Sequence, residues 1–357
     1  MPQAQGAAPV WVLLGSRHGD NQQLLAVAQA LGLPFRAIRL KFNRAAGVPP
    51  VLLGTSRLSW RCESDTPLAG PWPRVVLAAG RKSVPAARWV QHQSGGRTRL
   101  VHFNRPWAPL SWFDLVVSTP QYALPQRDNV VVNCMPLLSS DVPAASALPA
   151  SLRQQEAAMP RPWTLVMVGG SSRPYVLDDD AAARLGQLVN AQVLATGGSA
   201  WVLASPRSPA SAMDNIERVL RVPSLVVRWG QGDNPYAALR GTADRFIVTT
   251  DSASMLTEAL LSGRPVLPFA LSARPDWRWR FASAWRTAAA RAPASSPARG
   301  FDALQDLGWL SSVRDVGLML RSLEAAGAFA VAGRAAELAR QERQATLSRI
   351  HALIDGN

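Results

Sequence analysis

Short apolar runs alternate with amphipathic segments along most of the 357 residues of the chain. The apolar runs are rich in Val and Leu, which is typical of strands buried on both faces of a parallel sheet, and the segments between them have helical spacing. The first half predicts strands at 10–14, 35–40, 74–79, 99–103, 113–118 and 130–133, with helices at 22–31 and 84–91. The second half predicts strands at 163–168, 200–205, 225–228 and 245–249, with helices at 181–189, 212–220 and 235–241. The predicted fold is therefore α/β, with two doubly wound, Rossmann-like halves.

A stretch rich in Pro, Ala and Ser, residues 139–162, interrupts this alternation. We interpret it as a linker, because it carries no firm periodicity beyond one short polar helix. The predicted organisation is an N-terminal domain, a linker, a second domain and a C-terminal helix, over residues 1–140, 141–162, 163–334 and 335–357. The polar amphipathic C-terminal helix is a candidate to pack back on the first domain.

The composition is that of a globular chain that can bury two cores, with 48% hydrophobic residues. Residues 1–20 contain one short apolar run without a basic start or a cleavage-site pattern, so neither a secretory signal nor a transit peptide is expected. No window approaches the ~18 apolar residues of a membrane span, and a cytoplasmic location is predicted. Cys62 and Cys134 are expected to be reduced and buried, because their spacing fits neither a disulfide framework nor a zinc site.

Positive charge is the unusual bulk property, with a formal net charge of +14 at neutral pH. Residues 1–150 hold 15 Lys and Arg against 6 Asp and Glu, whereas the remainder holds 23 against 18. Such a surface attracts phosphorylated substrates, anionic lipid or nucleic acid, and biased composition alone also produces it. The sequence shows no zinc finger, aromatic RNP-type strand or helix-turn-helix pattern, so nucleic acid is not an expected partner.

The most informative stretch runs from Thr249 to Val266 and is typical of a strand end, a capped short helix and a Gly-x-Pro turn. Asp251 and Ser252 are the alternatives for the helix N-cap. The positive end of such a helix favours an anion, for example a diphosphate. Glu258 follows Asp251 by two helical turns on the same face, where it could accept hydrogen bonds from ribose hydroxyls. The alternative is an ordinary strand-helix-turn unit in which Glu258 is a solvated helix residue.

The loop after the first predicted strand, residues 15–22, contains two titratable candidates for general acid/base chemistry, His18 and Asp20. Ligands bind at the carboxyl ends of strands in doubly wound sheets, and a sugar-transferring enzyme needs a group that takes the proton of its acceptor. The alternative is that Asp20 or Asn21 caps the helix that follows.

Two further loops follow predicted strands. Gly169 and Gly170 end the first strand of the second half, where glycine suits the close approach of a phosphate to backbone N–H groups. Residues 80–83 resemble the end of a Walker A loop but lack its first glycine, so they remain a candidate anion site without P-loop chemistry.

Other chemistries receive less support from the sequence. The acidic run 178–180 directly precedes a predicted helix, so capping and dipole complementarity explain it more simply than metal binding, and no metal is predicted. The absence of Gly-x-Ser-x-Gly and Gly-x-Gly-x-x-Gly argues against an α/β-hydrolase and against the usual dinucleotide-binding fingerprint.

Six motifs in a fixed order resemble one family, the bacterial family related to the plant mitochondrial-fission (elongate-mitochondria) factor. The motifs that carry the resemblance are residues 15–22, 75–82, 113–120, 168–170, 234–236 and 248–258. The similarity runs from about Val10 to Gly308. Members of this family look like glycosyltransferases of the GT-B type, and some carry the label of nucleoside-diphosphate-sugar epimerase.

The resemblance implies two Rossmann-like domains that face a cleft. It implies a nucleoside-diphosphate sugar held by the C-terminal domain, an acceptor approached by the N-terminal domain, and neither a metal nor a further cofactor. The donor contacts would then fall on Gly169, Gly170, Asn234, Asp251, Ser252, Ser254 and Glu258. Where relatives tend to show Ser-Arg-Arg-Thr-Pro, this chain has Ser-Pro-Arg-Ser-Pro at 205–209, so Arg207 stays a candidate phosphate contact on an altered backbone.

Two basic segments with large apolar side chains are candidates for contact with a membrane surface. Residues 274–286 interleave Trp with Arg, and the alternative is an amphipathic helix that packs Trp277 and Phe281 inward. Residues 41–61 combine basic side chains with Val51–Leu53 and Trp60.

Three functions remain open from the sequence. The first is a metal-independent glycosyltransferase that moves a sugar to a cell-envelope acceptor, with Asp20 or His18 as the base. The second is a nucleoside-diphosphate-sugar epimerase on the same fold, which acidic residues from both domains would favour. The third is a non-catalytic scaffold at the inner membrane. The expected partners are a nucleotide sugar and either a phosphorylated acceptor or an anionic membrane surface.

Overall fold

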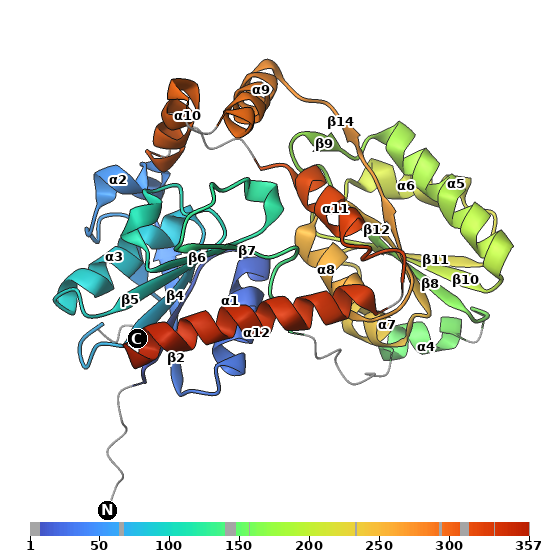
Figure 1. Ribbon diagram of the computed structural model, residues 1–357. Helices are drawn as coiled ribbons and strands as arrows, with labels where there is room; N and C mark the ends of the chain where they lie inside the picture. Colours follow the sequence, from blue (N-terminus) through green and yellow to red (C-terminus); the bar gives the residue numbers. More distant parts are fainter. Residues whose placement is uncertain are drawn as a thin grey trace, which may run out of the picture. The chain divides into compact units, whose positions relative to one another are not determined.

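The computed structural model of the protein describes residues 8–63, 68–139, 148–156, 158–232, 234–292, 295–307, 314–331 and 333–356. The chain forms two compact units (Figure 1). Unit 1 comprises residues 1–139, 278–314 and 340–357, and unit 2 comprises residues 140–277 and 315–339. The predicted second domain, 163–334, includes residues 278–314, whereas the structure assigns them to unit 1. Helical periodicity does not reveal which sheet a helix packs against. Residues 141–147 of the expected linker lie outside the described residues, and α4 (Ala150–Glu156) follows them.

Unit 1 contains a seven-stranded sheet in the order β3-β2-β1-β4-β5-β6-β7. Its strands are β1 (Val10–Leu14), β2 (Phe35–Phe42), β3 (Trp60–Cys62), β4 (Val75–Ala79), β5 (Arg99–Phe103), β6 (Leu115–Ser118) and β7 (Val130–Val132). All neighbours are parallel except β3, which pairs antiparallel with β2. The order 3-2-1-4-5-6 is that of the Rossmann fold.

The two faces of this sheet bury separate cores, because side chains alternate along each strand. The unit's helices are α1 (His18–Ala30), α2 (Pro50–Leu53), α3 (Val84–Gln93), α9 (Trp277–Arg291), α10 (Ser296–Asp306) and, from residue 340 onward, α12 (Arg334–Asp355), with 3-10 turns η1 (Arg44–Gly47), η2 (Arg81–Ser83), η3 (Leu110–Trp112) and η4 (Pro120–Tyr122). On β1, Val12 joins a core with α1 and α12, whereas Leu13 joins a core with α3. The C-terminal helix therefore packs on unit 1, with Ile350 fully buried.

Helix α9 does not bury the side chains expected from its sequence. Trp277 is 73% exposed and Phe281 is 60% exposed, so the alternative in which both pack inward is wrong. The buried positions of α9 are Ala282 and Ala289, which pack with Phe301 of α10. Trp285 of α9 packs against the same cluster, with its ring centre 5.7 Å from that of Phe301.

Unit 2 repeats the Rossmann order in a parallel five-stranded sheet, β11-β10-β8-β12-β13. Its strands are β8 (Trp163–Val168), β10 (Ser199–Ala204), β11 (Ser224–Val227), β12 (Arg245–Thr249) and β13 (Val266–Phe269), with a separate antiparallel pair, β9 (Tyr175–Val176) and β14 (Ser272–Ala273). Its further helices are α5 (Asp179–Thr196), α6 (Ala210–Val219), α7 (Tyr236–Thr242), α8 (Ala253–Leu261) and α11 (Val316–Ala325). Helices α5 and α6 bury one face of the sheet. The α/β prediction with two Rossmann-like domains is confirmed by the two strand orders.

Three smaller expectations can be compared with the structure. Asp178 is the N-cap of α5, where its Oδ1 accepts from Ala181 N at 2.9 Å and its Oδ2 pairs with Arg274 at 2.6 Å, so the capping interpretation of the acidic run is confirmed. Cys62 and Cys134 are half-buried rather than fully buried. Within the described ranges, no helix has both the length and the hydropathy that a membrane crossing requires.

Candidate functional site

The strand order of unit 1 changes direction at β1 and β4, and a cavity of about 420 Å³ lies beside the carboxyl ends of these strands. The helix after β1 and the helix after β4 pack on opposite faces of the sheet, which opens a crevice between them. The wall is formed by segments at the ends of three strands, at residues 15–17 with 20–21, 79–83, and 104–105 with 107, together with Phe42 and Tyr122. This position is the usual ligand site of a doubly wound sheet.

Asp20 lines this cavity from the first turn of α1. Its Oδ1 accepts a hydrogen bond from Asn104 Nδ2 at 3.0 Å. Burial raises the pKa of the Asp20 carboxyl above its usual value, although the charges of Arg17 and Arg314 and the bond from Asn104 oppose that shift. Asp20 is therefore a carboxyl group with increased basicity at the edge of a polar cavity.

The capping interpretation of Asp20 and Asn21 is wrong, because α1 begins at His18, four residues before the predicted start. Arg17 occupies the N-cap position without a side-chain hydrogen bond. Asn21 instead closes the loop, since its amide accepts from Gly15 N at 2.8 Å and donates to Gly15 O at 2.9 Å. Asp20 is left to face the cavity.

The structure does not bring His18 into the cavity beside Asp20. His18 is exposed, it is absent from the cavity wall, and its Nε2 lies 3.2 Å from Gln22 Nε2. Of the two acid/base candidates of this loop, Asp20 is the one that lines the cavity.

Sequence reasoning missed His102, which lies on β5 directly behind the cavity. The ring is fully buried, with Nδ1 3.2 Å from Asn104 O and Nε2 3.4 Å from Gly80 O. Burial lowers the pKa of His102 to about 4, so the ring is neutral at physiological pH. It connects two of the loops that form the cavity wall. A lone His inside a predicted buried strand is the only signal that the sequence offers for this role.

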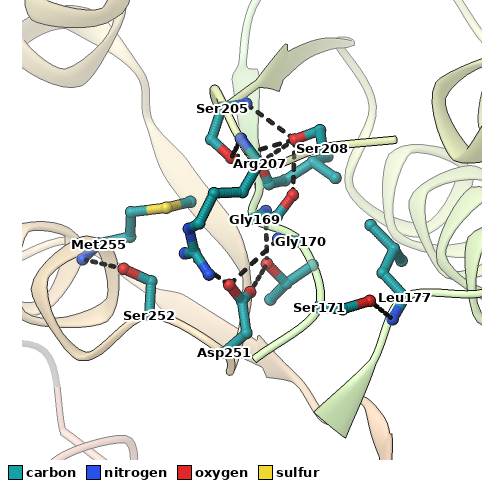
Figure 2. A network of polar contacts seen from close by, with 12 residues as sticks. Gly169, Gly170, Ser171, Leu177, Ser205, Arg207, Ser208, Asp251, Ser252 and Met255 are labelled. Atoms are coloured by element: carbon teal, nitrogen blue, oxygen red, sulfur yellow. Dashed lines mark hydrogen bonds and ion pairs between the residues drawn. The ribbon is translucent and has the colours of Figure 1, made fainter. Parts of the chain in front are cut away.

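In unit 2, the strand order changes direction at β8 and β12, and a polar network occupies their carboxyl ends (Figure 2). Asp251 follows β12 and has no exposed surface. Its Oδ1 accepts from Thr249 Oγ1 at 2.7 Å, and its Oδ2 accepts from Gly170 N at 3.1 Å. The same Oδ2 forms an ion pair with Arg207 Nη2 at 2.7 Å. The network thus connects the loops after β8, β10 and β12.

The two glycines after β8 allow this close packing. A Cβ at Gly169 would lie 2.0 Å from Asp251 Oδ1, and a Cβ at Gly170 would lie 2.2 Å from the carbonyl oxygen of Arg207. The backbone N–H groups expected to approach a phosphate donate within the protein, Gly169 N to Thr249 Oγ1 at 2.7 Å and Gly170 N to Asp251. These glycines shape the loop rather than leaving two open donors.

The loop after β10 places Arg207 beside this network. Ser208 Oγ accepts from Ser205 N at 2.8 Å and lies 2.6 Å from Gly169 O, which fixes the loop against the end of β8 (Figure 2). The Arg207 side chain is 44% exposed, while its Nη2 reaches the buried carboxylate.

The structure decides between the two candidate N-caps of α8. Ser252 is the N-cap, with its Oγ accepting from Met255 N at 3.5 Å (Figure 2). Asp251 points into the network instead. Ser254 is half-buried in the first turn of α8.

Glu258 lies one turn further along α8 in a second cluster. Tyr236 donates its hydroxyl hydrogen to Glu258 Oε2, and Arg240 Nη1 lies 3.2 Å from the same oxygen. Burial, and next the charge of Glu258, raise the pKa of Tyr236 well above its usual value. Asn234 is connected to this cluster through Tyr236, whose backbone N donates to Asn234 Oδ1 at 3.0 Å. Within the described residues neither side-chain contact to Glu258 uses Oε1, which leaves one carboxylate oxygen to accept from a ligand.

The predicted donor residues therefore form two groups. Gly169, Gly170, Arg207 and Asp251 contact one another directly, whereas Asn234 and Glu258 belong to the Tyr236 cluster, and Ser252 and Ser254 lie on the first turn of the helix that carries Glu258. Asn234 also lines a cavity of about 190 Å³ beside Trp229, which is 53% exposed.

The two sheets and the polar groups at their points of reversal define an α/β protein with two Rossmann-like domains. The chain belongs to the family described as Mitochondrial fission ELM1, whose model matches residues 18–296. It is 29% identical to the Mitochondrial fission protein ELM1 of Arabidopsis thaliana over 219 residues, 54% of this chain and 51% of the plant protein. It is 23% identical to the Uncharacterized protein RP120 of Rickettsia prowazekii (strain Madrid E) over 299 residues, 73% of this chain and 82% of that protein. The chain thus matches about half the length of the plant relative.

Two solved structures resemble the chain more distantly. The UDP-GlcNAc 2-epimerase of Methanocaldococcus jannaschii matches at 10% identity and a TM-score of 0.45, over 88% of this chain and 91% of its own. The MurG protein of Acinetobacter baumannii matches at 11% identity and a TM-score of 0.37, over 94% and 99%. At these identities and TM-scores the resemblance gives no evidence about function. The fold class is assigned from the strand orders of the two sheets.

Proposed function

We propose that the protein is a metal-independent glycosyltransferase that moves a sugar from a nucleoside diphosphate to a cell-envelope acceptor. Unit 2 binds the donor and unit 1 binds the acceptor. Two Rossmann-like sheets, each with polar side chains at its point of reversal, support this division, because such edges are where these sheets bind ligands. Family membership gives no reaction by itself.

The observation that carries the proposal is the Asp20 carboxyl at the 420 Å³ cavity of unit 1. A carboxylate with a raised pKa is a better proton acceptor than an ordinary aspartate. In the proposed reaction, Asp20 takes the proton of an acceptor hydroxyl while the hydroxyl oxygen bonds to the anomeric carbon. The bond from that carbon to the diphosphate breaks, and the nucleoside diphosphate leaves with its electron pair.

On the donor side, Glu258 Oε1 would accept from a ribose hydroxyl and the first turn of α8, at Ser252 and Ser254, would face the diphosphate. The half-exposed Arg207 side chain supplies positive charge to the leaving group, which a metal supplies in other transferases. The Asp251 carboxylate has no exposed surface, so its role in this proposal is to hold Arg207 and the two glycines in position. This burial also gives less support to the epimerase alternative, which needs acidic groups that reach the sugar from both units.

The test is turnover of a panel of nucleotide sugars, followed as release of the nucleoside diphosphate with water or an added hydroxyl acceptor. Asp20→Asn should bind the donor as the wild type does and lose about 10²–10⁴-fold in rate, the usual contribution of a general base. An Asp20→Asn variant that keeps the wild-type rate would exclude Asp20 as the base. A chain that binds the nucleotide but turns over no sugar under any acceptor would support the scaffold alternative.

One observation favours a membrane-peripheral role beside catalysis. Trp277 and Phe281 are exposed on α9 among basic residues, and Leu52 and Leu58 are 74% and 71% exposed in the basic segment 41–61. Exposed aromatic and aliphatic side chains beside arginine suit the surface of an anionic bilayer. Sedimentation with phosphatidylglycerol vesicles, compared with neutral vesicles and with Phe281→Ser, tests this placement at the inner membrane.

A further inference from the structure

Arg105 lies directly after β5 and is 2% exposed, which is rare for an arginine. The main chain turns sharply around Arg105, because Asn104 and Trp107 both have a left-handed conformation, with φ of +66° and +55°. This conformation is uncommon outside glycine and is strained for a residue as bulky as Trp107. The loop is held nonetheless, since Asn104 N donates to Val117 O on β6 at 2.8 Å. The result is a buried guanidinium group in the cavity wall.

The hydrogen-bonding capacity of Arg105 is mostly unused within the protein. Its Nη1 donates to Tyr122 O at 3.3 Å, and its guanidinium lies 5.0 Å from the centre of the Trp107 ring. The structure records no carboxylate within 4 Å of it among the described residues, although Asp302 and Asp306 are near enough to favour its charge. A guanidinium group has five N–H donors, so most of them have no protein acceptor. Burial lowers the pKa of Arg105 to about 10, which still leaves it charged at neutral pH.

The remaining charges of the cavity wall are also mainly positive. Arg17, Arg81 and Lys82 line it with Arg105, and Asp20 is the carboxylate of the lining. Arg81 Nη2 donates to the carbonyl oxygens of Ala46 and Gly47, neither of which neutralises its charge. A buried cation without a bonded anion is unfavourable, whereas an anion in the cavity would restore the lost interactions.

We propose that the cavity of unit 1 binds a phosphate-bearing ligand, a phosphomonoester or a diphosphate, with the buried Arg105 as its anchor and Arg17, Arg81 and Lys82 around it. The planar guanidinium fork matches two phosphate oxygens, and the exposed Arg17 and Lys82, with the half-buried Arg81, add charge without fixing geometry. This inference rests on the proposed function in one respect: the ligand is the sugar acceptor, because Asp20 lies in the same cavity. The acceptor is then a phosphorylated molecule whose reacting hydroxyl lies near Asp20.

The test is calorimetric titration of the full chain with inorganic pyrophosphate at low salt. Saturable binding to one site should weaken at least tenfold in Arg105→Met, which keeps the length of the side chain, and measurably in Lys82→Gln, which changes an exposed side chain and leaves the fold intact. Arg97→Gln is the matched control, because Arg97 is exposed at the amino end of the same β5 strand. Thermal unfolding of each variant separates lost binding from lost fold.

Two results would overturn the inference. One is the absence of saturable pyrophosphate binding, and the other is binding that Arg207→Met in unit 2 abolishes while Lys82→Gln and Arg105→Met leave it unchanged. If a nucleoside diphosphate still binds through Glu258 in either case, the inference fails and the proposed function stands. The converse result is a chain that binds pyrophosphate through Arg105 and binds no nucleotide. That result supports the anion site and excludes the proposed transferase function.

A sugar 1-phosphate titrated in the same way distinguishes the two sources of the anion. Tighter binding than that of inorganic phosphate supports a phosphorylated acceptor. Tighter binding of inorganic phosphate, still dependent on Arg105, supports the anion site and overturns its assignment to the acceptor.

Discussion

Asp251 and Arg207 form an ion pair in which the carboxylate is fully buried and the guanidinium side chain is 44% exposed, with 2.7 Å between Oδ2 and Nη2. The pair joins the loop after β12 to the loop after β10, and Gly170 N donates to the same carboxylate. Charge at this edge of the sheet is therefore balanced before any ligand binds. A donor phosphate would share Arg207 with Asp251.

Arg207→Met should destabilise unit 2, because it leaves a buried carboxylate with fewer partners. We expect a loss of about 1–3 kcal/mol in the free energy of unfolding, the usual cost of a buried polar group that loses a partner. Urea unfolding measures it. Arg207→Lys should recover part of the loss, and Arg97→Met, an exposed arginine in unit 1, should change stability little. Equal stability of Arg207→Met and the wild type would show that the pair contributes nothing.

Gly170→Ala should be destabilising because its Cβ would lie 2.2 Å from the backbone oxygen of Arg207. The neighbouring atom is main chain, so the loop itself must move, at a cost of about 1–3 kcal/mol or more. Gly47→Ala is the matched control, since its Cβ would meet no heavy atom within 4 Å. The midpoint of urea unfolding should shift for position 170 and stay within error for position 47.

His102 should make the protein sensitive to acid. Its folded-state pKa of about 4 lies below the ordinary value of 6.5, so the unfolded chain takes up a proton first as the pH falls. Stability is therefore retained above pH 6.5 and lost between about pH 6.5 and pH 4, by roughly 3 kcal/mol in total. His102→Gln should flatten this part of the curve of unfolding free energy against pH, whereas exposed His92→Gln should not. An unchanged slope in His102→Gln would contradict the assignment.

Asp20 should stabilise the fold less as a carboxylate than as a neutral group, because burial raises its pKa. The folded state then holds its proton to a higher pH than the unfolded state, so stability falls as the pH rises from about 3.8 through the folded-state pKa. Asp20→Asn, which can still accept from Asn104, should unfold at the same or a higher temperature than the wild type at pH 7. The difference should shrink toward pH 4. A lower melting temperature of the variant at both pH values would argue that the carboxylate is stabilising.

The strands of the sheets could be predicted from the sequence because buried parallel strands form continuous apolar runs. The predicted strands at 163–168 and 245–249 coincide with β8 and β12. The short edge strand β3 and the antiparallel pair of β9 with β14 were missed, since two or three residues carry no periodicity. The edge strand β13 was missed because the Gly-x-Pro turn before it was taken as the end of the motif.

The site could be predicted only in part. The loops at residues 15–22, 169–170 and 249–258 lie at the carboxyl edges of the sheets, as topology requires. The burial of Asp251 could not be predicted, because it depends on partners far away along the chain, Arg207 and Gly170. Arg105 gave no signal either, since an arginine beside a strand is normally exposed and only the fold shows that it is buried.

Unit 2 should bind a nucleoside diphosphate through the Oε1 carboxylate oxygen of Glu258, which neither described side-chain contact uses. Calorimetric titration with UDP, GDP, CDP, ADP and dTDP tests it directly. Glu258→Gln is the informative variant. Its amide oxygen can still accept from Tyr236, whereas an NH2 group that donates replaces the Oε1 oxygen that would accept from the ligand. Glu156→Ala, an exposed glutamate of α4, is the matched control. We expect tight binding of one nucleotide that weakens at least tenfold, about 1.4 kcal/mol, in Glu258→Gln and is unchanged in the control. Binding of no nucleotide, or equal binding by Glu258→Gln and the wild type, would contradict it.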